Sequence, residues 1–187
     1  MKKYLPKLFS LVLFLFLGIN SYGQASFYGV RLGMSSSEVK SVLAAKGKEY
    51  QTITPSKPTN YDYFLKISNP RIGDTSFENA IFYFKDGKLT EGRFYCSDDA
   101  GGNPNAYAFD RVEKNARDYY KTYQTMYANL VSKYGQANVS NDTRHIWIKS
   151  QYKIELHYAY DDHMEYGVSR QARAFLALVY CYNTSDY

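Results

Sequence analysis

The 187-residue chain has few of the residues that active-site chemistry most often needs. It contains two cysteines, three histidines and one tryptophan. It has no Gly-x-Ser-x-Gly, no phosphate-binding glycine loop and no His-Glu-x-x-His pattern. With no residue cluster that compels a reaction, we expect a non-enzymatic protein with no cofactor and no bound metal.

Two kinds of partner are also excluded. The longest apolar run, Leu8 to Leu17, is interrupted by Ser10 and is shorter than the roughly 20 residues that span a bilayer. Basic residues form no cluster of the kind that binds nucleic acid. The first cysteine is Cys96, which excludes a lipid anchor on an N-terminal cysteine. We therefore expect neither a transmembrane segment in the mature chain nor a nucleic-acid partner.

The N-terminus has the three parts of a secretory signal peptide. Lys2, Lys3 and Lys7 provide a basic start, the apolar run follows, and Ser21 and Gly23 are small residues where a signal peptidase would cut. We predict cleavage after Gly23, with Ala25 nearly as suitable. Removal of residues 1–23 takes away three lysines and no acid, so the net charge falls from +5 to +2. The remaining residues, 24–187, have the size of one globular domain, which we expect in the periplasm or outside the cell.

The mature chain is rich in tyrosine, which buries its ring while its hydroxyl stays hydrated. Tyrosine is also a good strand residue, so this composition is typical of a half-exposed sheet.

Local patterns predict helices and strands along the chain. Ser35 and Glu38 form a capping box that begins a helix, which ends near Gly47. Asp86-Gly87 between apolar runs predicts a hairpin, and Ala172 to Tyr182 is apolar on both faces, as in a central strand. A second, longer helix is predicted from a stripe with helical spacing, made of Phe109, Val112, Ala116, Tyr119, Tyr123, Met126, Leu130 and Tyr134.

The order of these elements predicts the fold class. A helix followed by three strands occurs twice, within residues 27–97 and 105–187. We therefore expect an α+β fold of two helix-plus-three-strand units that form an antiparallel sheet, with the helices packed on one face. The third strand of each unit ends in a cysteine, Cys96 or Cys181. In an oxidising compartment these two either form a disulfide or remain as buried free thiols.

The segment from Gly29 to Val39, Gly-Val-Arg-Leu-Gly-Met-Ser-Ser-Ser-Glu-Val, resembles the opening of several exported bacterial domains. It is similar to the tandem helix-and-sheet fold of β-lactamase inhibitor proteins and to that of small outer-membrane-assembly lipoproteins. The anchoring cysteine and the Gly-x-Pro of those lipoproteins are absent. The resemblance implies a non-enzymatic protein that offers a sheet face to another protein.

The strands around Trp147 provide the candidate binding surface. If Ile146 and Ile148 face the core, then Trp147 faces outward, as at an interface hot spot. A one-residue change of register would instead bury Trp147. The predicted surface, for another envelope or secreted protein, consists of Trp147, His145, Lys153, Glu155 and His157.

Two other functions fit the sequence. The tyrosines and Trp147 are compatible with a module that binds a small molecule or a glycan. The third possibility is a small metal-dependent hydrolase, because residues 161–171 read as a polar loop beside a strand and several metal-ligating residues gather there. These are His157, Asp161, Asp162, His163 and Glu165.

Overall fold

A computed structural model describes residues 26–101, 106–165 and 169–183, without the side chains of Ala106 and residues 163–171. The predicted signal peptide lies outside the described residues. The elements in chain order are β1 (Ser26–Phe27), β2 (Val30–Arg31), α2 (Ser36–Ala45), β3 (Gln51–Ile53), β4 (Tyr63–Ser68), β5 (Arg71–Ile72), β6 (Thr75–Ser76), β7 (Asn79–Lys85), β8 (Lys88–Asp99), α3 (Ala106–Tyr134), β9 (Val139–Ser140), β10 (Arg144–Ile148), β11 (Tyr152–Glu165) and β12 (Ser169–Tyr182).

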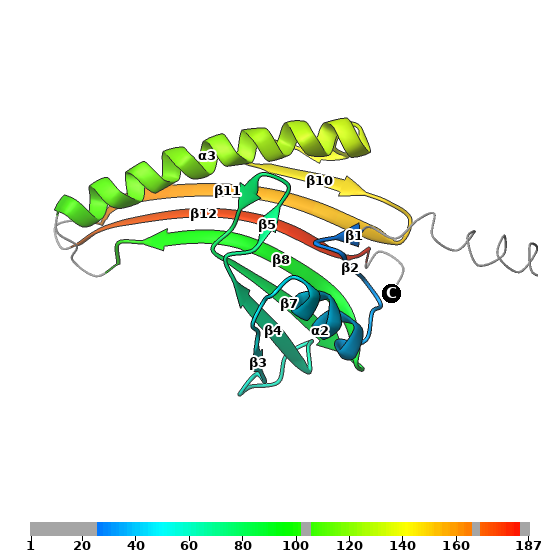
Figure 1. Cartoon of the computed structure of the whole chain (residues 1–187). Coiled ribbons are helices and arrows are strands. Elements are labelled where there is room, and N and C mark those ends of the chain that lie inside the picture. The colour runs from blue at the N-terminus through cyan, green and yellow to red at the C-terminus, as the bar shows by residue number, and fades with distance from the viewer. Residues whose placement is uncertain (1–25, 102–105, 166–168, 184–187) are drawn as a thin grey trace, which may run out of the picture.

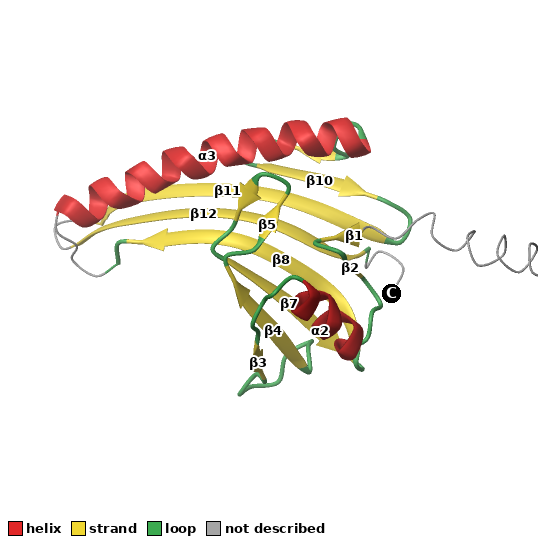
Figure 2. Ribbon diagram, in the orientation of Figure 1, coloured by secondary structure: helices red, strands yellow, loops and turns green. Residues whose placement is uncertain are grey.

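The fold is mostly β, with more residues in strands than in helices (Figure 2). Eight strands form one antiparallel sheet in the order β3-β4-β7-β8-β12-β11-β10-β9 (Figure 1). The predicted α+β fold of two helix-plus-three-strand units is therefore wrong. Each half of the sheet has four strands, and β8 and β12 join the halves into one continuous sheet. Between β4 and β7, the short strands β5 and β6 form a separate hairpin.

Two features of the strands explain this correction. The outermost strands, β3 and β9, have three and two residues, too few for an alternating pattern to be recognised. The predicted polar loop at residues 161–171 is instead largely strand, because β11 and β12 stay paired from Asp161↔Arg173 to Glu165↔Ser169. Hydrogen bonding to the neighbouring strand holds these polar residues in the sheet without an apolar pattern.

The predicted helices are both present. Ser35 caps α2: its hydroxyl accepts from the backbone of Glu38, whose carboxylate accepts from the Ser35 backbone at 2.7 Å. In α3, the predicted stripe is largely buried, with Val112 fully inaccessible and Tyr123 3 % exposed. Figure 1 shows α3 lying along β11 and β12, and α2 in front of β4 and β7. Neither described helix has the length and apolarity that crossing a membrane requires.

The Asp86-Gly87 turn is confirmed. Both residues have positive φ, 51° and 71°, and they join β7 to β8. Asp86 is held in place by Asp62, whose carboxylate accepts from its backbone N–H at 2.6 Å.

The two faces of the sheet differ in what covers them. On the core face, Phe82, Phe94 and Leu178 are fully buried in the same cluster as Val39 and Leu43 of α2. The alternate side chains of the same strands point to the opposite face, and most of them are half-buried. Because both described helices pack on the core face, this second face is the one available to a partner.

Near the β9 edge of the sheet, asparagine residues make hydrogen bonds to the backbone of β10 beyond the short strand β9. The Asn138 backbone N–H donates to the Ile146 carbonyl at 2.8 Å. Its side-chain oxygen accepts from the Ile148 backbone N–H at 2.6 Å. The side-chain oxygen of Asn141 likewise accepts from the Arg144 backbone N–H at 2.7 Å. These contacts satisfy backbone groups of β10 that a longer edge strand would otherwise pair.

Candidate functional site

Trp147 and His145 face the core, not solvent. Trp147 is fully buried and lies opposite Ile154, while His145 is 7 % exposed and lies opposite Leu156. The indole N–H of Trp147 donates to the Gly135 carbonyl at 2.7 Å, which fixes the ring beneath the end of α3. The predicted outward orientation of these two residues is therefore wrong. The register is the alternative one, which a shift of one residue produces.

The other three predicted residues do lie on the available face. We call this face the open face and define it by the alternate side chains of the five central strands. It consists of Ile81 and Tyr83 on β7, Glu91, Arg93 and Tyr95 on β8, Phe175 and Val179 on β12, Lys153, Glu155 and His157 on β11, and Ile146 and Ile148 on β10. Ile148 is 43 % exposed.

Four charged groups on this side of the sheet form two ion pairs, Arg93 with Glu91 and Arg144 with Glu155. Arg93 donates to Glu91 at 2.8 Å and lies over the ring of Tyr83, 5.6 Å from its centroid. Tyr61 donates its hydroxyl to Glu91 at 2.8 Å. Burial and the neighbouring Glu91 carboxylate raise the pKa of Tyr61, so this hydroxyl keeps its proton. On the far side of β12, Arg144 donates to Glu155 at 2.8 Å.

Aromatic and apolar side chains occupy the space between these pairs. The Tyr83 ring lies 5.5 Å from that of Phe64 on the neighbouring strand, and the His157 ring lies 5.9 Å from that of Phe175. Val179 lies directly between Arg93 and Glu155 in the register of the sheet. The open face is therefore a mixed surface, in which apolar and aromatic side chains lie between two ion pairs and Nε of Arg93 is buried without a hydrogen-bond partner among the described residues.

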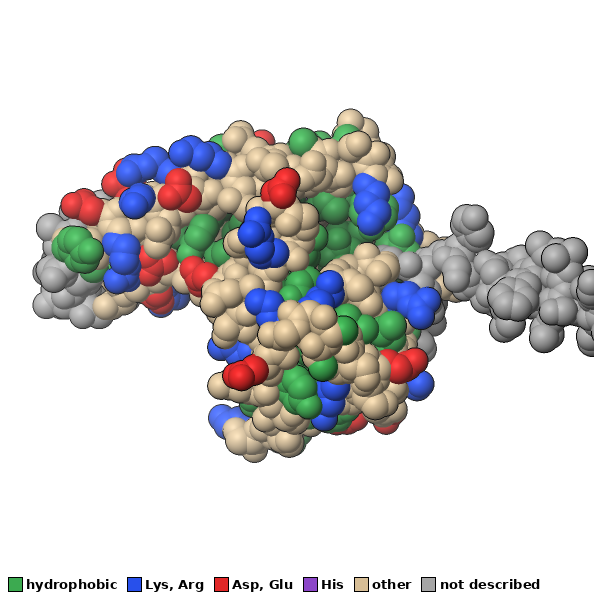
Figure 3. Space-filling model, in the orientation of Figure 1, with side chains coloured by type: hydrophobic (Ala, Val, Ile, Leu, Met, Phe, Trp, Pro, Cys, Tyr) green, Lys and Arg blue, Asp and Glu red, His purple; other side chains and the backbone are tan. Residues whose placement is uncertain are grey.

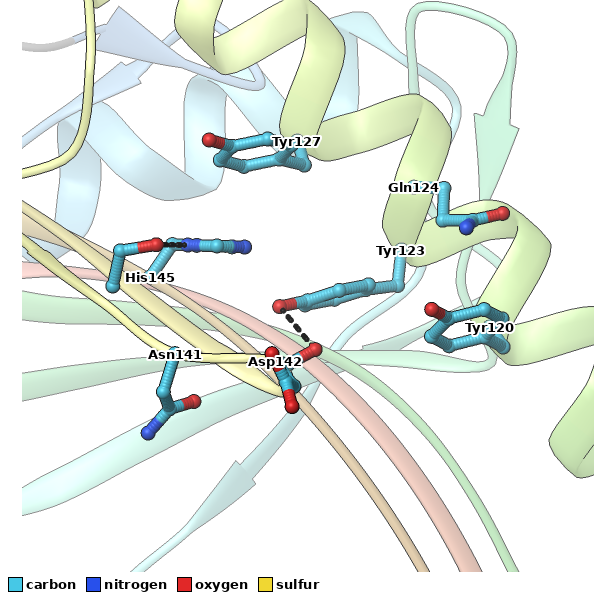
Figure 4. A pocket seen from close by; sticks show the side chains of 8 residues that line it. Tyr120, Tyr123, Gln124, Tyr127, Asn141, Asp142 and His145 are labelled. Carbon is cyan, nitrogen blue, oxygen red and sulfur yellow. Dashed lines mark hydrogen bonds between the residues drawn. The ribbon is translucent and has the colours of Figure 1, made fainter.

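A second candidate site lies between α3 and the β9–β10 edge; we call it the α3 groove. It contains a hollow of about 500 Å³, lined by Tyr120, Tyr123, Gln124, Tyr127, Ser140, Asn141, Asp142 and His145 (Figure 4). A second hollow of about 350 Å³ adjoins it at Tyr120 and is lined further by Glu113, Ala116, Arg117, Lys121, Tyr158 and Tyr160.

Aromatic rings are stacked in the α3 groove. The His145 ring lies 3.9 Å from the ring of Tyr127 and 5.6 Å from that of Tyr123, and the rings are nearly parallel. Nδ1 of His145 is 2.6 Å from the Ser140 hydroxyl. Burial lowers the pKa of His145, so the ring is neutral at pH 7.

Of the two alternatives for the cysteines, the structure has the free thiols and not the disulfide. Cys96 lies opposite Leu176 and faces the core, whereas Cys181 lies opposite Glu91 and faces the open side. They are five residues apart in the register of adjacent strands, about 17 Å, far beyond the span of a disulfide. Burial raises the pKa of both thiols to about 11, so neither is a thiolate at neutral pH.

The residues of the hydrolase alternative are spread along β11 instead of gathering in a loop. His157 and Asp162 point to opposite faces of the strand, since their positions differ by an odd number. Among the side chains that the structure describes, no group of three metal-ligating residues comes together. The side chains of His163 and Glu165 lie outside the described part of the chain.

Neither the α3 groove nor the Glu91–Arg93 pair was predicted from the sequence. A signal for the groove does exist in the sequence. Glu113, Arg117, Tyr120, Gln124 and Tyr127 are spaced 4, 3, 4 and 3 and follow one flank of α3 beside the buried stripe.

Comparison of the chain with protein-family models, with curated proteins and with solved structures found no match.

Proposed function

We propose that this chain is an exported, non-enzymatic domain that binds another envelope or secreted protein through its open face. The observation that carries the proposal is the contrast between the two faces of the sheet. Both described helices pack on one face, and the other presents half-buried apolar and aromatic side chains between two ion pairs. Such a surface marks a site of protein association when it is larger than scattered single residues.

The charges of the open face support a protein partner. Glu91–Arg93 and Arg144–Glu155 are ion pairs within the chain, so covering them does not leave a lone charge without a counter-ion. Lys153 lies between Cys181 and Ile148 in the register, beside these pairs. A partner that covers Val179 and Ile146 would place an acidic side chain opposite Lys153, which would fix its orientation.

The proposal of a non-catalytic role is supported by the state of the reactive side chains. Both thiols are protonated at neutral pH, and the buried Glu91 carboxylate already accepts from Tyr61 and Arg93. Export is supported by the N-terminal sequence pattern, and the resemblance to β-lactamase inhibitor proteins and to assembly lipoproteins agrees with a sheet-face binder.

Site-specific photo-crosslinking tests the proposed surface. We expect a photoreactive residue in place of Val179 to capture a discrete envelope or secreted protein in the producing cell. The matched control is a photoreactive residue in place of Lys114, which is exposed on α3, away from the sheet. Adding Ile146→Arg to the protein with the photoreactive residue at position 179 should lower the yield of crosslinked partner about tenfold. The reason is that this change places a charge among the apolar side chains of the surface. Equal capture from Val179 and Lys114 would contradict the proposal.

A further inference from the structure

The α3 groove is long, and its two hollows lie in line. Their shared residue, Tyr120, belongs to the flank of α3 that also holds Arg117 and Tyr127. The helix rises about 1.5 Å per residue, so the distance along its axis from Arg117 to Tyr127 is about 15 Å. This length, and the combined space of the two hollows, suits an extended ligand better than a compact one.

Aromatic rings provide the walls of the groove. Tyr120 is 41 % exposed, and its ring lies 6.0 Å from that of Tyr123, nearly parallel, and 5.2 Å from that of Tyr158. In Figure 4 the rings of Tyr127, His145 and Tyr123 lie at successive levels around the hollow.

A polar atom of a buried side chain points into this space. His145 is more than nine-tenths buried, and its Nδ1 is bound to Ser140. Its other nitrogen, Nε2, forms no hydrogen bond with the described residues and is directed into the hollow in Figure 4. Among the described residues, Arg93 Nε is the buried side-chain atom without a hydrogen-bond partner, so Nε2 of His145 is accessible from the hollow. A ligand hydroxyl that reached this nitrogen could hydrogen-bond to it, and this contact would orient the ligand.

The groove is close to neutral in charge. Between Thr122 and Ser132, α3 has no charged residue, and Figure 3 shows its charged side chains gathered near the N-terminal end. In the second hollow, Glu113 and Arg117 form an ion pair with each other, and Lys121 lies 3.6 Å from the Asp118 carboxylate. Asp142 is the one charged residue that lines the first hollow in the described structure. In the first hollow, an anionic ligand would therefore meet no cation, and both cations that line the second hollow already have an acidic neighbour.

We infer that the α3 groove binds a neutral oligosaccharide, laid along the helix with its sugar rings against the tyrosines. The C–H faces of a pyranose pack on aromatic rings, and its hydroxyls both donate and accept hydrogen bonds. The neutral imidazole of His145, the Gln124 amide and the Asp142 carboxylate can each bind such a hydroxyl. The inference is separate from the proposed function, because the groove and the open face lie on opposite sides of the sheet.

Affinity electrophoresis tests this inference with defined probes. Purified protein is run in native gels that contain laminarin, hydroxyethyl cellulose, xylan, mannan or soluble starch, with alginate as an acidic comparison. We expect at least one neutral polysaccharide to retard the protein. Retardation by none of the five, or by alginate alone, would overturn the inference.

Matched variants show whether the groove is the site. Tyr120→Ala should weaken retardation about tenfold, since it removes the ring that both hollows share. Tyr120→Phe should restore it. Tyr107→Ala removes a tyrosine of the same helix that is 76 % exposed and does not line the groove, and should bind as wild type does. If Tyr120→Ala and Tyr107→Ala bind equally well, the groove is not the site.

Two further measurements separate the groove from the open face. Val179→Arg alters the open face alone, so it should leave retardation unchanged while it lowers capture of a protein partner. Trp147 is the single tryptophan, and its ring lies 6.1 Å from that of Tyr127. An oligosaccharide of the retarding polysaccharide should therefore change its fluorescence in wild type and not in Tyr120→Ala. An unchanged signal at saturating oligosaccharide would count against binding beside Tyr127.

Discussion

The ring of Phe27 lies flat against the ring of Tyr180, with centroids 4.4 Å apart and planes 12° from parallel. This contact joins β1, near the start of the described chain, to β12, near its end. It requires a glycine, because Gly92 lies opposite Tyr180 in the sheet and directly beneath Phe27. A Cβ at Gly92 would be 2.1 Å from a ring carbon of Phe27.

Gly92→Ala should destabilise the protein through this contact. The added methyl group cannot fit without displacing the Phe27 ring, so we expect the free energy of unfolding to fall by about 2 kcal/mol or more. Urea unfolding followed by circular dichroism measures the loss.

The double variant provides the control for this change. Phe27→Ala alone should cost about 3 kcal/mol, because it removes a buried aromatic ring. Adding Gly92→Ala to it should then cost little, since the methyl group occupies the vacated space. Strictly additive losses would show that Phe27 does not lie over Gly92.

Trp147→Phe should lower the free energy of unfolding by about 2–3 kcal/mol, because it removes buried volume and leaves the Gly135 carbonyl without its indole donor. The matched control is Ile148→Ala, at the next position of β10 and on the open face. Since Ile148 is 43 % exposed, that change should cost less than about 1 kcal/mol. Thermal unfolding measures the loss of stability in both variants. A larger loss for Ile148→Ala than for Trp147→Phe would contradict the burial of Trp147.

The local elements were predictable from the sequence where a pattern is long or its chemistry is specific. The capping box at Ser35, the Asp86-Gly87 turn and the stripe of α3 each depend on residues close together in the chain. The orientation of β10 was not predictable. Its five residues carry apolar side chains on both faces, and only the pairing of Trp147 with Ile154 decides which face is buried. The extension of β11 past Asp161 also depends on a partner strand, not on local composition.

Alkylation tests the free state of the cysteines. Native protein should react slowly with iodoacetamide near pH 8, because burial raises the pKa of both thiols to about 11. In guanidinium chloride without any reductant, Cys96 and Cys181 should each take up one carbamidomethyl group, counted by mass spectrometry. An unfolded chain that reacts only after reduction would establish a disulfide.

The free energy of unfolding should depend on pH through the histidines. Burial lowers the pKa of His145 and of His157, so as the pH falls the unfolded chain binds protons before the folded chain does. Stability is then fully retained above about pH 6.5 and declines as the pH falls below that value. Urea unfolding at several pH values between about 7.5 and 5.5 measures the slope.

Glutamine variants assign this slope to its source. His145→Gln and His157→Gln should each remove part of the decline, because the replaced side chain no longer titrates. A decline of unchanged size in the double variant would place the effect on other groups.

The candidate sites were predictable in part. Lys153, Glu155 and His157 alternate with Ile154 and Leu156, and this alternation alone places them on the open face. Val179, Tyr95 and Ile81 lie beside them only because β8 separates β7 from β12, an order of strands that no local pattern contains. The α3 groove needs the turn at Asn141 to approach the helix, a contact between distant segments.

The asparagine at position 138 restricts how any partner can attach. By bonding the Ile148 N–H and the Ile146 carbonyl, it occupies two of the backbone groups with which a further strand would pair. Chains of this protein are thereby hindered from growing into filaments through that border. Beside Ile148, a partner must instead be recognised through the shape and chemistry of side chains, which makes attachment there selective for the partner's sequence.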